Sequence, residues 1–387
     1  MINKVNAIIE RIEKELIELN EYIYKNPELG LKEYKAAKAH VDLLRAHGFY
    51  VQEEYIGIKT AFKAIKESEK TGPTIAYLAE YDALPGIGHG CGHNLLGTTS
   101  TGAGIVLGEL ISEIGGKVIV FGTPAEENFG GKVDMVNYGS FEDVDVVMLS
   151  HPMHKYIKSG KSLAMEAIQF TFKGKSAHAA AFPEKGINAL DAAINTFNNI
   201  NALREHIRRD ARVHGIIKEG GIAANIVPDL AIAQFYVRAT TKTYLQKLVD
   251  KVKNCARGAA LAAGTELEII NYETSYDNMV TNETLMEAYS KNLRNFGIRD
   301  LEEGEKITGS MDAGNVSHVC PTIHPSFSIS DKEVVAHTIE FAEASIQPLA
   351  YEGMKKTIGT LVLTAVDVLQ DESLLKAIKE EFKNSEK

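Results

Sequence analysis

A cysteine and a histidine stand two residues apart in a glycine-rich segment, Gly88-His89-Gly90-Cys91-Gly92-His93. The glycines allow the backbone to fold tightly around a small ligand. A redox pair would need a second cysteine at C-x-x-C spacing, and the segment has none. A thiolate with imidazole and carboxylate partners suits zinc or another first-row divalent metal. The alternative is a buried structural cysteine beside a surface histidine, because free cysteines are among the most buried residues.

Two adjacent carboxylates, Glu126 and Glu127, follow Thr123-Pro124-Ala125. Acidic pairs are common on solvated loops, but beside a metal they can divide the work. One carboxylate binds the ion while its neighbour accepts a proton from water. His151 follows another apolar run and His337 precedes a late helical pattern. Each is either a metal ligand or a hydrogen-bonded structural histidine.

Three short apolar runs precede most of these groups and predict buried strands at residues 74–79, 117–121 and 144–149. Helical patterns such as residues 95–111 separate them, which predicts an α/β fold with a mostly parallel sheet covered by helices. Ligands bind outside the carboxyl ends of the strands in such sheets. The chemistry-bearing groups that follow the runs should therefore converge at one edge.

The order of predicted elements changes in the middle of the chain. There the order strand-helix-strand-strand-helix-strand predicts a ferredoxin-like α+β domain that is inserted into the α/β domain. We expect a first domain at residues 1–162 and 275–387, and an inserted domain at residues 163–274. The expected elements are strands at 163–173, 212–218, 229–239 and 265–273 and helices at 3–25, 32–47, 186–209, 243–263 and 342–369.

The inserted domain carries three further candidates. His178 lies between small residues after the first strand, where it would be open to a partner or a substrate. Asn225 precedes a strand, and Arg238 lies near the end of that strand. A strand arginine can bind a carboxylate through two hydrogen bonds, and a structural ion pair is the equally plausible alternative.

Composition excludes several function classes. The net charge is −10, with 42 Lys+Arg against 52 Asp+Glu, and no basic run suggests a nucleic-acid partner. Three cysteines are too few for a disulfide framework, which favours a reducing, cytoplasmic location. The first residues lack the apolar core of a signal peptide, and no apolar run has the ~18 residues of a membrane span, so no membrane partner is expected.

Five motifs together resemble the aminoacylase/carboxypeptidase/dipeptidase family of co-catalytic metallopeptidases. They are similar to its amidohydrolase branch, which includes hippurate, auxin-conjugate and aminobenzoyl-glutamate hydrolases and β-alanyl-lysine dipeptidase. The similarity runs in order through nearly the whole chain. The motifs are Asp82-Ala83-Leu84-Pro85, Cys91-Gly92-His93, Pro124-Ala125-Glu126-Glu127, Ser176-Ala177-His178-Ala179 and His337-Thr338.

The resemblance implies a zinc-exopeptidase-like catalytic domain with a lid and dimerisation domain, and two divalent ions per subunit, zinc or manganese. It implies Glu126 as general base and Asp82 as the residue that orients a metal ligand. His178 would act in a partner subunit of a homodimer, and Asn225 and Arg238 would bind the substrate. The implied metal ligands are Cys91, His93, Glu127, His151 and His337.

The expected reaction is hydrolysis of a small N-acyl amino acid or dipeptide through a metal-activated water. Two departures from the family pattern resemble a sub-branch with β-alanyl-lysine dipeptidases and aminobenzoyl-glutamate hydrolases: Glu80 stands where the wider family has a histidine, and Asn94 follows the cysteine motif. A cysteine-nucleophile amidase using Cys91 and a non-catalytic metal-binding subunit remain as alternatives.

Overall fold

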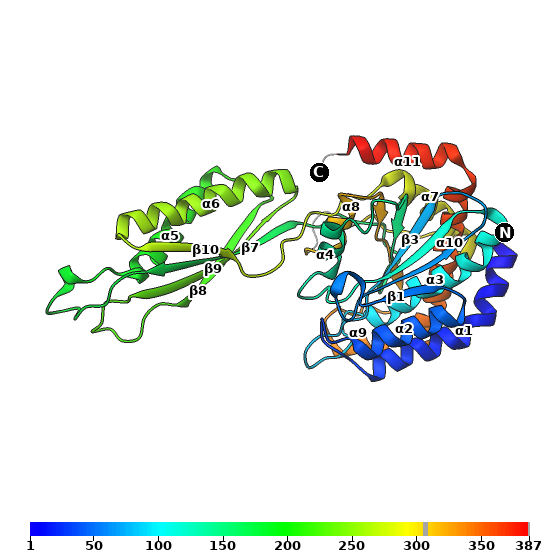
Figure 1. Ribbon diagram of the computed structural model, residues 1–387, viewed down its shortest axis with the longest axis horizontal. Coiled ribbons are helices and arrows are strands. Elements are labelled where there is room, and N and C mark those ends of the chain that lie inside the picture. Colours follow the sequence, from blue (N-terminus) through cyan, green and yellow to red (C-terminus); the bar gives the residue numbers. More distant parts are fainter. Residues whose placement is uncertain (305–308, 386–387) are drawn as a thin grey trace. The chain divides into compact units, whose positions relative to one another are not determined.

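The computed structural model describes residues 1–304 and 309–385 and divides into two compact units (Figure 1). The first unit contains Met1–Lys161 and, among the described residues, 279–304 and 309–385. The second unit is Ser162–Asn278. Within the described residues, no helix has the length and apolarity needed to cross a membrane.

The first unit is built on a six-stranded sheet in the order β1-β2-β4-β3-β5-β11. Strands β4, β3, β5 and β11 are parallel, whereas β1 and β2 join one edge antiparallel. The predicted mostly parallel sheet is confirmed, although the sequence analysis did not include β1, β2 or β11. The strands are β1 (Tyr50–Glu53), β2 (Phe62–Glu67), β3 (Thr74–Ala79), β4 (Lys117–Gly122), β5 (Val146–Met148) and β11 (Thr322–Ile323).

Helices cover both faces of this sheet, which explains why its strands are apolar without alternation. Ile75 and Tyr77 of β3 pack into the core formed by the helices α1, α2, α3 and α10. Ala76 and Leu78 pack on the opposite face beside α4 and α8. The helices are α1 (Ile2–Lys25), α2 (Tyr34–Ala46), α3 (His93–Ile114), α4 (Gly131–Tyr138), α8 (Ala313–Ser317) and α10 (Pro348–Gln370).

The prediction of a single closing helix at residues 342–369 is wrong in one respect, because the chain forms two helices there. The first, α9 (Ile339–Ala344), ends before Pro348, and Pro348 then begins α10. Proline has no N–H to donate and is favoured at the start of a helix. The unit also contains α7 (Glu283–Leu293), α11 (Glu372–Asn384) and the parallel pair β6 (His151–Met153) and β12 (Ser326–Ser328).

The second unit has a four-stranded antiparallel sheet in the order β10-β7-β9-β8. Its helices share one core with alternate residues of β7 and β9, including Phe170 and Phe235. The predicted helix at 186–209 is shorter, since Asn188 caps it and a 3-10 turn follows Leu203. The elements are β7 (Ala164–Lys173), α5 (Ala189–Leu203), β8 (Arg212–Glu219), β9 (Leu230–Ala239), α6 (Lys242–Ala263) and β10 (Glu266–Asn271).

Candidate active site

The predicted groups of the first unit lie beyond the carboxyl ends of its parallel strands. Asp82 follows β3, the pair Glu126 and Glu127 follows β4, and His151 follows β5. Cys91 precedes the first residue of α3, and His337 lies in the loop before α9. The sheet topology therefore brings together segments that are up to 255 residues apart, from Asp82 to His337.

Two of the loops at this edge hold residues in the left-handed backbone region. Ala125 has φ 63° and His337 has φ 67°, a conformation that costs a non-glycine residue roughly 1–2 kcal/mol. The Glu33 carboxylate accepts the Ala125 N–H at 2.8 Å, and the Gly90 carbonyl accepts the His337 N–H at 2.8 Å. The surrounding contacts thus hold both loops in strained conformations directly beside the predicted chemistry.

Three groups of possible metal ligands overlap at this edge. Cys91, His93 and His151 form one group, and Cys91, Glu127 and His337 form another. His93 also groups with Glu126 and Glu127. Within each group the ligand atoms lie within 4.8 Å of one another. The structure therefore brings all five predicted ligands together, with Cys91 common to two groups.

The distances between ligand atoms match those of tetrahedral metal sites. Cys91 Sγ lies 3.5 Å from His151 Nε2, and His337 Nε2 lies 3.5 Å from Glu127 Oε1. Ligand atoms bound about 2.0–2.3 Å from one zinc ion in a tetrahedron are roughly 3.3–3.6 Å apart. His93 Nε2 and Glu127 Oε1 are buried and make no hydrogen bond among the described residues, although His93 Nε2 lies 3.3 Å from Glu80 and Glu127 Oε1 lies 3.5 Å from His337. Buried polar atoms need partners, so this donor set fits a pair of divalent ions.

Asp82 connects two of the predicted ligands. One carboxylate oxygen lies 2.9 Å from His93 Nδ1, and the other accepts the Glu127 N–H at 3.0 Å. Burial opposes ionisation of Asp82, but His93 and the Glu127 amide outweigh it and hold the pKa of Asp82 below its usual range. With Nδ1 engaged by Asp82, the other nitrogen of His93 faces the ligand groups.

Glu126 has the environment of a general base. Burial raises the pKa of its carboxyl well above the usual range, and the nearby carboxylates Glu80 and Asp312 raise it further. One Glu126 oxygen lies 4.0 Å from His93 Nε2. A carboxylate whose proton affinity is raised can accept a proton from water and return it to a leaving group.

A buried lysine beside this site was missed by the sequence analysis. Lys132 has no exposed surface, and its Nζ lies 2.7 Å from both Glu80 Oε1 and Asp312 Oδ1. The second Glu80 oxygen lies 3.3 Å from His93 Nε2. Burial opposes ionisation of Glu80, but the Lys132 ammonium overcomes it and lowers the Glu80 pKa. The only sequence signal was the position of Lys132 in the glycine-rich segment after Glu126-Glu127.

His324 is a second residue that no sequence motif had indicated. Its ring lies beside that of His151, with 5.8 Å between the ring centroids, and its Nδ1 lies 3.3 Å from Met311 Sδ. Burial lowers the pKa of His324 to about 3, so the imidazole is neutral. The neighbourhood of the predicted site thus contains a neutral histidine that no motif indicated.

A cavity of about 400 Å³ opens onto these groups. Cys91, Glu126, Glu127, His151 and His337 line it together. His93 and Asp82 are each 1% exposed and support the site from beneath. A cavity of this size accommodates a small amide substrate beside the ligand groups and the candidate base.

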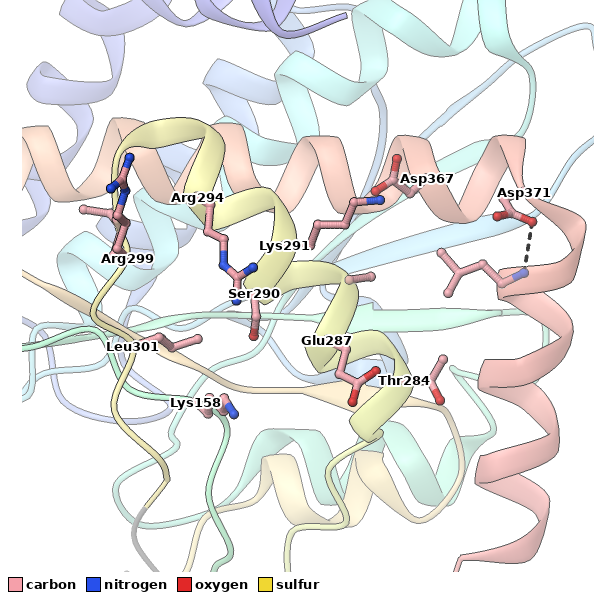
Figure 2. A pocket seen from close by; sticks show the side chains of 13 residues that line it. Lys158, Thr284, Glu287, Ser290, Lys291, Arg294, Arg299, Leu301, Asp367 and Asp371 are labelled. Carbon is pink, nitrogen blue, oxygen red and sulfur yellow. Dashed lines mark hydrogen bonds between the residues drawn. The ribbon is translucent and has the colours of Figure 1, made fainter.

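A larger cavity of about 780 Å³ lies beside α7 and the ends of α10 and α11, as Figure 2 shows. Its charged side chains carry both signs, and Glu287, Lys291 and Arg294 are exposed. Asp371 accepts N–H groups at the start of α11. No histidine or cysteine is among the described residues that line this cavity. The chemistry is therefore concentrated in the smaller cavity.

Two of the candidates in the second unit are neighbours. The Asn225 carbonyl accepts the Ala179 N–H at 3.1 Å, next to His178. His178 Nδ1 accepts backbone N–H groups of Ala180 and Ala181 at 3.3 and 3.2 Å. Arg238 lies toward the other end of β9, which places it roughly 26 Å along the strand from Leu230. The second unit therefore groups His178 with Asn225 and does not group Arg238 with them.

Comparison with known proteins agrees with this arrangement. Residues 163–263 match the family model of a peptidase dimerisation domain. The Xaa-Arg dipeptidase of Mus musculus is 37% identical over 394 residues, covering 97% of this chain and 90% of that protein. The chain belongs to the M20 peptidase family. One component chain of the p-aminobenzoyl-glutamate hydrolase from Escherichia coli is 34% identical over 322 residues, which cover 78% of this M20 peptidase and 66% of that chain.

Solved structures share the fold of this M20 peptidase. A putative aminohydrolase from methicillin-resistant Staphylococcus aureus superposes with a TM-score of 0.79 at 20% identity, over 95% of this chain and 100% of that one. The Bacillus subtilis YXEP protein is described as a dinuclear metal-binding peptidase of the M20 family. It superposes with a TM-score of 0.70 at 20% identity, over 92% of this chain and 99% of that one. The predicted α/β fold with an inserted domain is confirmed.

This M20 peptidase is a metal-dependent hydrolase of amide or peptide bonds, as its sequence predicted. The geometry also argues against the alternative of a cysteine nucleophile. Burial raises the pKa of the Cys91 thiol to about 12, whereas reactive cysteines have a depressed pKa. A thiolate bound to a divalent cation has no such difficulty, because the cation itself stabilises the deprotonated sulfur.

Proposed function

We propose that this M20 peptidase is a two-metal dipeptidase that cleaves small dipeptides with a basic C-terminal residue. The observation that carries the proposal is the pair of ligand groups that share Cys91. The basic C-terminal residue is supported by the 37% and 36% identity to the proteins named Xaa-Arg dipeptidase from Mus musculus and Homo sapiens. N-acyl amino acids such as aminobenzoyl-glutamate are the second candidate class, supported by the Escherichia coli relative.

Each ion would have its own protein ligands in addition to the shared Cys91. His93 and His151 would hold one ion, and Glu127 and His337 would hold the other, with zinc or manganese as the metal. When bound, the two ions would polarise the scissile carbonyl and lower the pKa of a water molecule. Asp82 would fix the ring orientation of His93 through its contact with Nδ1.

Proton transfer would be the task of Glu126. Its carboxylate would accept a proton from the attacking water and return it to the leaving amine, which needs the raised proton affinity that burial gives it. His178 would stabilise negative charge on the carbonyl oxygen. Because its Nδ1 accepts backbone N–H groups, its Nε2 carries a proton and can donate a hydrogen bond, as such a role requires.

The second unit would act as a lid and a dimerisation domain, supported by the match to a peptidase dimerisation domain. Asn225 would contact the substrate beside His178, and Arg238 would bind its carboxylate. The working enzyme would be a homodimer in which His178 serves the active site of the partner subunit. A cytoplasmic location remains a prediction that the few cysteines favour.

A substrate screen with metal analysis tests the proposal. Purified protein would be freed of metal, reloaded with Zn²⁺ or Mn²⁺, and assayed with Leu-Arg, Leu-Lys, Leu-Glu and aminobenzoyl-glutamate. The expected result is two ions per chain and the highest kcat/KM for Leu-Arg and Leu-Lys. Turnover of aminobenzoyl-glutamate with no cleavage of Leu-Arg would support the second class instead. Activity that persists without metal would contradict both.

A further inference from the structure

The active-site cavity is also lined by apolar side chains. Met153 comes from β6, and Ile157 follows it in the chain. Met279 and Met311 line the same cavity from two other segments of the first unit. Three methionines and an isoleucine from three separate segments therefore converge beside the ligand groups. These side chains offer mainly apolar contact, and Met311 Sδ also lies 3.3 Å from His324 Nδ1.

The charged groups that line the cavity already have partners or a part in the chemistry. Glu80 pairs with Lys132 at 2.7 Å, and Glu126 and Glu127 belong to the candidate base and metal ligands. Lys158 is the one cation among the lining residues that the structure describes, and it pairs with Glu303 at 2.5 Å. The four apolar residues carry no charge, so a charged substrate side chain packed against them would lose its hydration without gaining a counter-ion from them, which is costly.

Methionine side chains give this wall the ability to adapt. Each has three rotatable bonds and a polarisable sulfur, so it fills irregular space and adjusts to ligands of different shape. Binding surfaces that accept many partners are often rich in methionine for this reason. Rigid branched residues would instead select one side-chain size. The three methionines thus point to breadth among apolar groups.

We propose that this apolar wall, Met153, Ile157, Met279 and Met311, binds the side chain of the substrate's N-terminal residue and accepts apolar side chains of different sizes. The inference rests on the proposed dipeptidase function. The C-terminal residue, with its carboxylate and basic side chain, needs charged partners that this wall does not supply. The N-terminal side chain is the part of such a dipeptide that matches it.

Matched dipeptides test the wall in the unaltered enzyme. Leu-Arg and Asp-Arg have N-terminal side chains of similar size, as do Met-Arg and Glu-Arg, and each pair differs mainly in charge. The expected kcat/KM is at least about 100-fold lower for the acidic member of each pair. Ala-Arg, Leu-Arg, Met-Arg and Phe-Arg should fall within roughly tenfold of one another. Cleavage of Asp-Arg as fast as Leu-Arg would overturn the inference.

A variant tests which residue forms the wall. Met153→Phe fills part of the cavity and should lower kcat/KM for Phe-Arg at least tenfold relative to Ala-Arg. Ala-Arg turnover in the same preparation controls for folding and metal loading. Met135→Leu changes a buried methionine of α4 that does not line the cavity, and it should leave the ratio within twofold. An unchanged ratio in Met153→Phe would contradict the assignment.

The outcomes separate the inference from the function on which it rests. A loaded enzyme that cleaves no dipeptide would remove the dipeptidase proposal itself. An enzyme that cleaves dipeptides but does not discriminate apolar from charged N-terminal residues would remove only the apolar wall. Strict preference for a single apolar residue would also overturn the inference, because the wall would then be selective rather than adaptable.

Discussion

Asp82 contacts His93 Nδ1 with one carboxylate oxygen at 2.9 Å and accepts the Glu127 N–H with the other at 3.0 Å. One buried side chain therefore orients two candidate metal ligands from different loops. Groups that orient metal ligands in this way usually contribute 10–100-fold to metal affinity. The relationship makes Asp82 a direct test of the metal site.

Asp82→Asn should weaken metal binding by roughly 10–100-fold. The amide keeps one oxygen acceptor, but its NH₂ group cannot accept the second hydrogen bond. Competition with a chromophoric chelator measures the affinity. Asp134→Asn, on the exposed side of α4, is the matched control and should bind metal like the unaltered protein. Equal metal affinity for Asp82→Asn and the control would contradict the orienting role.

The neighbouring carboxylates Glu126 and Glu127 should give opposite results when each is changed to glutamine. Glu126→Gln should lower kcat about 10²–10⁴-fold and keep both ions, because an amide cannot accept the proton. Glu127→Gln should lose metal, because it removes a ligand from the group with Cys91 and His337. Elemental analysis and turnover of the same samples check the contrast. Near-normal kcat in Glu126→Gln would place the base elsewhere.

Lys132→Met should destabilise the folded protein by about 3–5 kcal/mol, because it leaves Glu80 and Asp312 as buried charges without their common partner. Denaturant unfolding of the metal-free protein measures the loss. Lys32→Met, at an exposed lysine, should change stability by less than about 0.5 kcal/mol. Adding Asp312→Asn to Lys132→Met should recover part of the loss. A double variant whose losses simply add would argue against charge compensation.

Glu33 should make stability fall as pH rises from about 4.5 to about 7. Burial, aided by nearby Asp82, raises the pKa of this carboxyl from 4.5 to about 7. Between these values the folded protein binds a proton that the unfolded chain has released, so stability is lost as pH increases. Glu33→Gln cannot ionise and should gain up to about 3 kcal/mol relative to the unaltered protein between pH 5 and pH 8.

The measurement for Glu33 is the difference in unfolding free energy between variant and unaltered protein at several pH values. Taking the difference cancels the groups that both proteins share. Glu69→Gln, at an exposed glutamate, is the matched control. A Glu33→Gln difference that does not change with pH would show that Glu33 ionises normally in the folded protein.

Mixed dimers test whether His178 acts in the partner subunit. An inactive His178→Ala chain mixed with an inactive Glu126→Gln chain should regain part of the activity, because one site would combine an intact base with an intact partner histidine. Light scattering checks that dimers form, and a tagged subunit verifies exchange. Absence of recovery after verified exchange would place His178 in the same subunit or outside catalysis.

Much of the site could be predicted because its residues lie close to strand ends in the sequence. The apolar runs at 74–79, 117–121 and 144–149 are long enough to mark buried strands, and Asp82, Glu126 and His151 follow them within a few residues. Local pattern therefore indicated both the sheet edge and its chemistry. Cys91 and His93 needed only the glycine-rich spacing, and the resemblance to a family added their roles.

The parts decided by tertiary structure depend on residues far apart in the chain. Lys132 and Asp312 are 180 positions apart, and no local pattern of either predicts that they meet in a buried ion pair. Strand β11 has two residues and exists because β5 offers it a parallel partner. His324, Met279 and Met311 also line the cavity, although they lie far along the chain from Glu80 and Cys91. Sequence pattern determined which groups lie at the sheet edge, whereas packing between distant segments determined what surrounds and neutralises them.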